Sequence, residues 1–289
     1  MSDFIPWDSR SLDEWRSKYA PGKILDIDGL STHYIECGQG EPVILIHGFY
    51  QDLNTWIKNI DALARHFKVF AYDLWGLGYS TRQAHEYGYP LYVNQLSHFL
   101  DALGIKKAHL IGHSLGGGTA IAFSAQNKER VNKLILVDSA GIPRSLPFRS
   151  KIFNLPNVGE LLMSFNTNII RRKTFTDLWI YDTKVLSPEL FEQLFRFQKI
   201  EGSSKAMLTI LRKDFFNTLS TEIDLLRTLD IPTMVIWGEK DRNIPLETGV
   251  EMHRRLKGSR FEAFPNAGHM SNLEFPAKFN QLVLDFLRG

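Results

Sequence analysis

Short runs of apolar residues recur along the chain, and helical patterns separate several of them. Runs of this kind are typical of strands that are buried on both faces of a sheet. The apolar runs are 43–46, 69–72, 108–111, 134–137 and 233–237. The helical stretches are 54–66, 91–103, 115–126 and 246–256. Strands that alternate with helices predict an α/β fold, with a parallel sheet covered by helices on both faces.

Both ends of the chain add strands and helices to this pattern. Two strand-like stretches are joined at Asp28-Gly29, a dipeptide that favours a tight hairpin. The elements that we expect outside the central alternation are a helix over 9–19, strands over 23–27, 32–36 and 260–264, and a helix over 272–287.

The alternation stops between residue 142 and about residue 224. This stretch has helical signals only, is rich in Phe, Leu and Met, and begins with Pro143 and Pro147. It predicts a helical insertion between two strands of the sheet. We therefore expect a core domain made of residues 1–142 and 225–289, with a helical cap over residues 143–224.

Composition narrows the class of protein. The chain has 289 residues, enough for one α/β domain with an insert and for a core that needs no disulfide or metal. A formal net charge of +2 gives no reason to expect nucleic acid as a partner. The single cysteine excludes an intrachain disulfide. The apolar runs fall short of the ~20 residues that span a bilayer, and the first residues lack a signal-peptide pattern, so we expect a cytoplasmic protein.

The stretch Gly112-His113-Ser114-Leu115-Gly116 lies between an apolar strand and a helix. In this context the motif is typical of a nucleophilic serine on a sharp strand-to-helix turn. Small residues flank such a serine because a Cβ atom there would collide with a neighbouring strand or helix. The start of the helix also favours a developing negative charge. Ser114 is therefore the candidate nucleophile.

A serine hydroxyl needs a base, and a third group must orient that base. Of the nine histidines, His269 is the candidate base because it lies in a loop between the last strand and the last helix. Asp241 follows the strand over 233–237 and is the candidate acid. Glu239 and Asp138 are its competitors, since each also follows a strand. The order serine, acid, histidine fits a Ser–His–Asp mechanism.

Two other histidines have structural interpretations. His47 is expected to shape a loop, and the side chain of His113 to point away from the reacting face. An oxyanion hole needs two N–H donors aimed at one point. We expect these donors to be the amide of Leu115 and the amide of Phe49, in the loop after the strand over 43–46. No metal ion is expected in the site.

Several motifs occur in a characteristic order, and together they resemble the α/β-hydrolase superfamily. They are His47-Gly48-Phe49, the stretch 73–80, Gly112-His113-Ser114-Leu115-Gly116-Gly117, Trp237-Gly238-Glu239-Lys240-Asp241 and Gly268-His269. The resemblance covers about residues 24–142 and 225–289. It implies an eight-stranded, mostly parallel sheet, a mobile helical cap over the site and no cofactor.

The branches of the superfamily differ at specific residues, which can be compared with the residues of this chain. Haloalkane dehalogenases and epoxide hydrolases use an aspartate nucleophile, so Ser114 argues against both. Meta-cleavage product hydrolases, which cut carbon–carbon bonds in dienoic acids, share the Ser-His-Asp set and are similar over residues 114–120. They usually have Asn before the serine, a Gly-rich stretch after His-Gly and Trp after the histidine. This chain instead has His113, Phe49-Tyr50-Gln51 and Met270. Carboxylesterases, lactonases and cofactor-free perhydrolases fit without these differences.

These residues predict an enzyme, a serine hydrolase that cleaves carboxylic esters of small to medium apolar substrates through an acyl-enzyme. The alternatives with the same triad are a carbon–carbon bond hydrolase of the meta-cleavage product type, a lactonase or a perhydrolase. The non-enzyme alternative is a ligand receptor with vestigial hydrolase activity. The expected partner is a small ester-type molecule, and the chain is expected to be a monomer or a homodimer.

Apolar side chains near the predicted site are candidates for the pocket wall. They are Phe49, Tyr50, Met163, Phe165, Phe175, Trp179, Phe215, Phe216 and Met270. The alternative for the cap residues among them is packing inside the cap. Four cations near the start of the cap, Arg144, Arg171, Arg172 and Lys173, could meet a carboxylate, although a solvated face is the commoner outcome.

Overall fold

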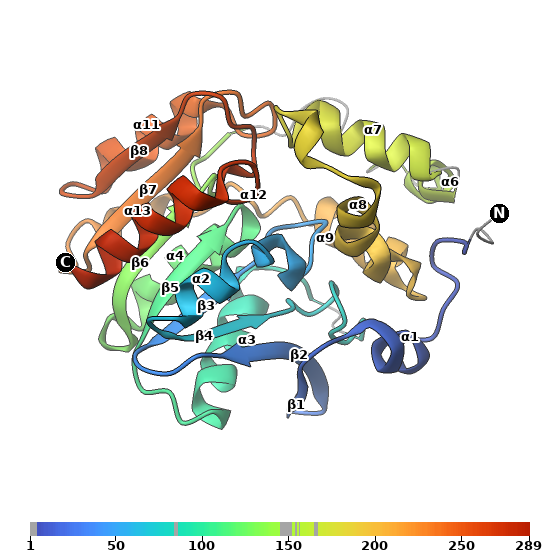
Figure 1. Ribbon diagram of the computed structural model, residues 1–289, viewed down its shortest axis with the longest axis horizontal. Coiled ribbons are helices and arrows are strands. Elements are labelled where there is room, and N and C mark those ends of the chain that lie inside the picture. The colour runs from blue at the N-terminus through green and yellow to red at the C-terminus, as the bar shows by residue number, and fades with distance from the viewer. Residues whose placement is uncertain (1–4, 84–85, 145–151, 154, 156, 165–166) are drawn as a thin grey trace.

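The computed structural model describes residues 5–83, 86–144, 152–153, 155, 157–164 and 167–289. Within these residues, eight strands form one sheet in the order β1-β2-β4-β3-β5-β6-β7-β8 (Figure 1). Pairs β1–β2 and β2–β4 are antiparallel, and the other neighbouring pairs are parallel. The strands are β1 (Lys23–Ile27), β2 (Leu30–Cys37), β3 (Pro42–Ile46), β4 (Lys68–Tyr72), β5 (Ala108–His113), β6 (Val131–Val137), β7 (Thr233–Gly238) and β8 (Arg260–Phe264). The expected eight-stranded, mostly parallel sheet is confirmed.

The hairpin between β1 and β2 turns at Asp28-Gly29, as the sequence predicts. Ile27 pairs with Leu30 across the turn. Both turn residues have positive φ, 53° for Asp28 and 78° for Gly29. This backbone matches the twist of the flanking strands in a two-residue hairpin.

Helices cover both faces of the sheet. On β3, Ile44 and Ile46 pack into a core with side chains of α3, α4 and α11, whereas Val43 and Leu45 pack into a second core with side chains of α2 and α13. Side chains alternate in this way because successive residues of a strand face opposite sides. The helices of this part are α1 (Leu12–Tyr19), α2 (Ile60–Ala64), α3 (Tyr89–Ala102), α4 (Leu115–Gln126), α11 (Leu246–Arg255), α12 (Ser271–Glu274) and α13 (Pro276–Arg288).

Two expected helices are each divided in two. The stretch over 54–66 forms a short 3₁₀ turn, η1 (Leu53–Trp56), followed by α2. Asn59 between them uses its side chain for hydrogen bonds to Asn272 and Asn280, which fixes it to a distant part of the chain. The stretch over 272–287 is divided at Pro276, because a proline cannot donate the N–H bond that a continuous helix needs there.

The residues between β6 and β7 are called here the inserted segment. Its described part forms helices and 3₁₀ turns: α6 (Val158–Ser164), α7 (Asn168–Leu178), η3 (Thr183–Val185), α8 (Pro188–Phe195), η4 (Arg196–Lys199), α9 (Ser203–Arg212) and α10 (Ser220–Leu226). In Figure 1, α6 to α9 gather at one end of the sheet. The last helix, α10, instead packs against α4 of the sheet layer.

The N-terminal residues run along the inserted segment. The amides of Asp8 and Ser9 donate to the carbonyls of Gln198 and Lys199, and Arg10 pairs with Ile200. Residues 8–10 therefore hold η4 in place by backbone hydrogen bonds. No helix in the described residues has the length and apolar character that crossing a bilayer requires.

Candidate active site

Ser114 lies at the sharp turn between β5 and α4. Its φ of 51° and ψ of −116° form a strained backbone that residues other than glycine rarely adopt. The turn is held from both sides, because the Ser114 amide donates to Val137 and the Ser114 carbonyl accepts from Ala140. Strain of this kind persists only where the surroundings impose it, and it is a hallmark of functional sites.

Glycines around Ser114 allow this close packing. A Cβ atom on Gly116 would collide with the carbonyl oxygen of Ile46, and one on Gly112 would collide with the carbonyl oxygen of Gly116. The first turn of α4 thus lies directly against the ends of β3 and β5. These contacts explain the small residues that the sequence places on both sides of the serine.

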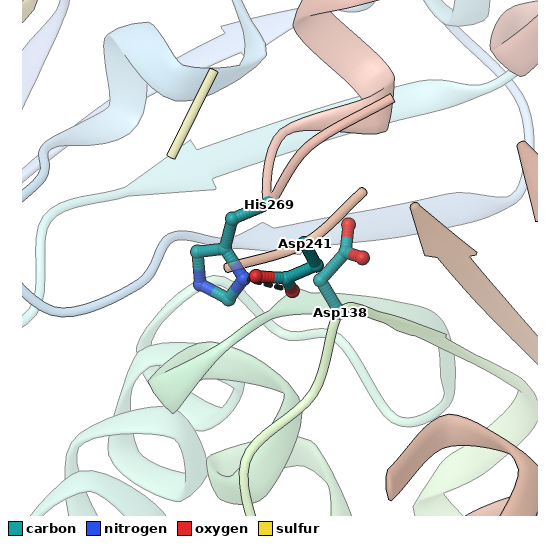
Figure 2. Close-up of side chains that lie close together, drawn as sticks. All are labelled: Asp138, Asp241 and His269. Atoms are coloured by element: carbon teal, nitrogen blue, oxygen red, sulfur yellow. Dashed lines mark hydrogen bonds and ion pairs between the residues drawn. The ribbon is translucent and has the colours of Figure 1, made fainter. Parts of the chain in front are cut away.

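His269 and Asp241 form a hydrogen-bonded pair. The Nδ1 atom of His269 lies 2.7 Å from Oδ2 of Asp241, and both side chains are fully buried (Figure 2). The other carboxylate oxygen, Oδ1, accepts N–H bonds from Asn243 at 2.7 Å and Ile244 at 2.8 Å. Nε2 of His269 is buried and has no hydrogen-bond partner in the described part of the chain. The pair therefore leaves one ring nitrogen available for a proton from another group.

Burial shifts the pKa values of both members of this pair. It raises the pKa of Asp241 and lowers the pKa of His269, because each charged form loses hydration. Two backbone N–H donors nevertheless face the Asp241 carboxylate, and they favour its ionised form. The arrangement therefore favours a neutral imidazole with its proton on Nδ1, which is the form that can act as a base through Nε2.

Two contacts fix the loop that carries His269. The carboxylate of Glu274 accepts the amide of Gly268 at 2.6 Å and the amides of Tyr181 and Asp182 in the inserted segment. His113 lies behind the loop, with Nε2 2.6 Å from the carbonyl oxygen of His269. Glu274 was not anticipated from the sequence, because a carboxylate at the start of a helix ordinarily faces solvent.

Asp138, the competitor from the end of β6, lies beside the pair. One oxygen of each carboxyl group and one ring nitrogen of His269 are all within 4.8 Å of one another. Asp138 itself accepts the amide of Gly238 at 2.8 Å. The hydrogen bond to His269 belongs to Asp241 and not to Asp138. The third candidate, Glu239, is exposed.

The expected oxyanion donors lie on adjoining segments. A Cβ atom on Gly48 would be 3.0 Å from Cβ of Ser114, so the loop after β3 touches the serine turn. Within the described residues, the amide of Phe49 donates to no acceptor. Leu115 is the first residue of α4, where an amide has no carbonyl four residues earlier in the helix. Both amides thus have no acceptor among the described residues and can donate to a ligand.

His47 has the structural role that the sequence predicts. Its Nδ1 lies 2.8 Å from the carbonyl oxygen of Gly48, and its Nε2 accepts the amide of Leu74 at 3.0 Å. The imidazole therefore joins the ends of β3 and β4 and leaves no nitrogen for the reaction.

Ser114 lines a cavity of about 400 Å³. Its wall is mainly apolar, and much of it comes from the inserted segment. The described lining residues are Phe49, Tyr50, Ser114, Ala140, Arg144, Phe153, Leu162, Met163, Ile170, Thr174, Phe175, Leu178, Trp179, Met207, Leu208, Leu211, Phe216, Asn217, Asn243 and Ile244. A cavity of this size and character suits a small molecule.

The predicted wall residues divide into three groups. Those found at the cavity are Phe49, Tyr50, Met163, Phe175, Trp179 and Phe216. Phe165 lies outside the described residues. Phe215 and Met270 are corrections, since neither lines the cavity. Phe215 packs on Tyr89, with ring centroids 5.0 Å apart, and Met270 is fully buried between the core and the inserted segment.

One of the four predicted cations reaches the cavity. Arg144 lines it and donates from Nη2 to the carbonyl of Asn243 at 2.8 Å, while its buried Nε has no partner among the described residues. Arg171 is instead buried against Gln198 and the ring of Trp7. Arg172 bonds to the carbonyl of Leu186, and Lys173 forms an exposed ion pair with Asp177.

Sequence comparisons match residues 41–276 to the family model of the α/β hydrolase fold. The chain is 30% identical over 273 residues to a 2-hydroxymuconate semialdehyde hydrolase of Pseudomonas sp. strain CF600, covering 92% of this chain and 93% of that protein. It is 32% identical over 277 residues to a 2-hydroxy-6-oxononadienedioate/2-hydroxy-6-oxononatrienedioate hydrolase of Paraburkholderia phymatum, covering 89% and 91%.

Solved structures also share this fold. A meta-cleavage product hydrolase from Pseudomonas fluorescens IP01 superposes with a TM-score of 0.81 at 27% identity, covering 92% of this chain and 97% of that one. A thermophilic esterase from Thermogutta terrifontis gives 0.78 at 26% identity, covering 92% and 98%. The family match, the two sequence relatives and the shared fold lead to one conclusion: this chain belongs to the α/β-hydrolase superfamily.

Proposed function

We propose that this chain is a serine hydrolase that cleaves the carbon–carbon bond beside a ketone in an unsaturated oxo acid. The observation that carries the proposal is that Ser114 and Arg144 line the same apolar cavity. A guanidinium in such a site can pair with a substrate carboxylate, while the apolar wall accommodates the rest of the molecule. The sequence alone favours ester cleavage. The names of the relatives favour the carbon–carbon alternative.

In the first half of the reaction, Nε2 of His269 takes the hydroxyl proton of Ser114, and Oγ attacks the ketone carbon. The amides of Phe49 and Leu115 stabilise the negative oxygen that forms. The substrate reacts as its dioxo tautomer, in which the carbon beside the ketone is saturated. The carbon–carbon bond then breaks, and its electron pair passes into the conjugated oxo acid fragment. The carbon released in this way takes the proton from His269. Asp241 stays ionised and holds the imidazole in the required tautomer.

In the second half, water replaces the leaving fragment at the acyl-enzyme. His269 removes a proton from the water as it attacks the ester carbon of the acyl group on Ser114. Collapse of the tetrahedral intermediate breaks the bond to Oγ, which takes the proton back from His269. The products are two carboxylic acids, one of them still bearing the group that pairs with Arg144.

Three of the five residues that differ from the usual meta-cleavage product pattern, Gln51, His113 and Met270, form one buried cluster. Nδ1 of His113 lies 3.0 Å from Oε1 of Gln51, and Nε2 of Gln51 lies 3.9 Å from the sulfur of Met270. None of the three lines the cavity. They therefore pack together next to His269 and away from the cavity wall. Phe49 and Tyr50, the other two differing residues, line the cavity and remain a difference from that pattern.

Ester hydrolysis is the second candidate. The mainly apolar wall and the likeness to the Thermogutta esterase favour it. The chemistry of Ser114, His269 and Asp241 is the same, and only the leaving group differs: an alcohol in place of a stabilised carbanion.

A substrate panel separates these candidates. Purified wild type and Ser114→Ala are compared on 2-hydroxy-6-oxo-2,4-heptadienoate and on p-nitrophenyl acetate and butyrate, with product identification by chromatography. We expect turnover of the dienoate, reduced by about 10⁴-fold or more in Ser114→Ala. Turnover of the esters with none of the dienoate would replace the proposal by an esterase. Equal rates in wild type and Ser114→Ala would exclude both.

A further inference from the structure

The mechanism leaves one buried carboxyl group beside the base without a role. Asp138 follows β6, and Asp241 follows β7, the neighbouring parallel strand. Both strands end at the same edge of the sheet, so the two carboxyl groups meet there. Figure 2 shows them on the same side of the His269 ring, and one oxygen of each lies within 4.8 Å of the other and of a ring nitrogen.

The present contacts of Asp138 do not need its charge. Oδ1 accepts the amide of Gly238 at 2.8 Å, and Oδ2 accepts the hydroxyl of Ser271 at 3.3 Å. The side chain is fully buried. An amide oxygen could accept the Gly238 bond equally well. Asparagine could therefore fill a purely structural role at this position. That role makes no use of the ability of a carboxyl group to ionise.

We propose that Asp138 is a second positioning acid for His269, able to hold the imidazole when the Asp241 carboxylate is lost. In the intact site Asp241 is the closer partner of Nδ1. Burial and the Asp241 charge raise the pKa of Asp138, which keeps its carboxyl neutral. Loss of the Asp241 charge removes this repulsion. Asp138 then releases its proton to solvent and accepts the N–H of His269 Nδ1. The proposal rests on the function proposed above, since His269 is its base.

The test compares Asp241→Ala with Asp241→Ala/Asp138→Asn, with turnover of the dienoate and of p-nitrophenyl acetate as the readouts. Loss of the acid of such a triad costs about 10⁴-fold. With a second acid in reach, we expect Asp241→Ala to lose only about 10- to 100-fold, and the double variant to lose the full amount. Asp138→Asn alone should cost far less than it does in the Asp241→Ala background, because it keeps the bond to Gly238.

Two further measurements distinguish a role of Asp138 in orienting His269 from a general structural effect of the substitutions. Asp241→Asn fills the space that Asp138 must enter, so it should be slower than Asp241→Ala. The kcat/KM of Asp241→Ala should also rise with pH further into the alkaline range than that of wild type, because Asp138 must ionise first. The double variant should lack this rise.

Equal rates for Asp241→Ala and the double variant, with wild type active and all proteins folded by circular dichroism, would overturn the proposal. Should Asp241→Ala unfold, Asp241→Ser takes its place in the same comparison, since it too leaves room for Asp138. A wild type that turns over neither the dienoate nor the ester would instead overturn the proposed function. The two failures are therefore distinguishable.

Discussion

At the scale of single residues, the burial of His269 lowers its pKa and so determines its reactivity as a base. Its ring is fully buried, its Nδ1 lies 2.7 Å from Oδ2 of Asp241, and the ring contacts those of His113 and Trp179 at centroid distances of 4.7 and 5.6 Å. Burial is the largest cause of its lowered pKa. The side chain therefore stays neutral at a pH where an exposed histidine would take up a proton.

This burial predicts the acid limb of the pH profile. The reaction needs the unprotonated imidazole, and the usual pKa of histidine is 6.5. Because the pKa of His269 is lower, kcat/KM should stay nearly constant as the pH falls through 6.5 and decline only below it. Initial rates in buffers of constant ionic strength check this. An acid limb centred at or above 6.5 would mean that the base is a more exposed group.

Arg144 is expected to select acidic substrates. A charge-assisted hydrogen bond contributes about 1.5–3 kcal/mol, so Arg144→Gln should raise KM for the dienoate by about 10- to 150-fold. The effect on a neutral ester should be much smaller. Arg144→Lys should restore part of the affinity because it keeps the charge.

The matched control for Arg144 is Arg172→Gln. Arg172 bonds to the carbonyl of Leu186 and does not line the cavity, so this variant removes an equal charge away from the substrate. Steady-state kinetics on both substrate types gives the comparison. Equal changes of KM in Arg144→Gln and Arg172→Gln would show that Arg144 does not contact the carboxylate.

At the scale of elements, the strands were the most predictable part of the molecule. The runs 43–46 and 108–111 form β3 and β5, because a strand buried on both faces must be apolar throughout. The divided helices were harder to foresee. The side chain of Asn59 bonds to residues more than 200 positions away, and no local pattern contains such a contact.

The end of β7 illustrates how closely the elements approach at the site. A Cβ atom on Gly238 would collide with the carbonyl oxygen of Gly268, next to His269. Gly238→Ala should therefore displace the loop that carries His269, lower the free energy of unfolding by about 1–3 kcal/mol, and reduce kcat. Urea unfolding and initial rates measure the two effects.

Gly88→Ala serves as the control for this variant. A Cβ atom there would meet Cδ of Pro90 at 3.5 Å, an ordinary contact, and Gly88 lies away from the cavity wall. If Gly238→Ala were as stable and as active as Gly88→Ala, the packing of β7 against the His269 loop would not constrain the site.

At the scale of the whole molecule, the candidate triad could be located from the sequence, whereas most of the cavity wall could not. Ser114 and Asp241 follow parallel strands, and His269 follows the last strand, so the topology brings all three to one edge of the sheet. The inserted segment has no such regularity. The rings of Phe215 and Phe216 stack 5.0 Å apart, yet Phe215 packs on Tyr89 and only Phe216 lines the cavity, a difference that long-range packing determines.

The N-terminal residues contribute to the placement of the inserted segment. The guanidinium of Arg171 lies 4.1 Å from the ring centroid of Trp7, and the ammonium of Lys199 lies 5.5 Å from it. Trp7→Ala should lower the free energy of unfolding by about 1 kcal/mol and make the inserted segment more sensitive to proteases. Ile169→Ala, a change at a side chain that is 79% exposed on α7, is the control. Identical digestion of both variants would contradict a role for Trp7.

The central claim is that Ser114, which lines the cavity, is activated by His269. The most direct measurement is intact-protein and peptide mass spectrometry after reaction with a fluorophosphonate. We predict one adduct, located on Ser114, formed rapidly in wild type and slowed by several orders of magnitude in His269→Ala. No adduct in folded wild-type protein, or an adduct on another residue, would contradict the account.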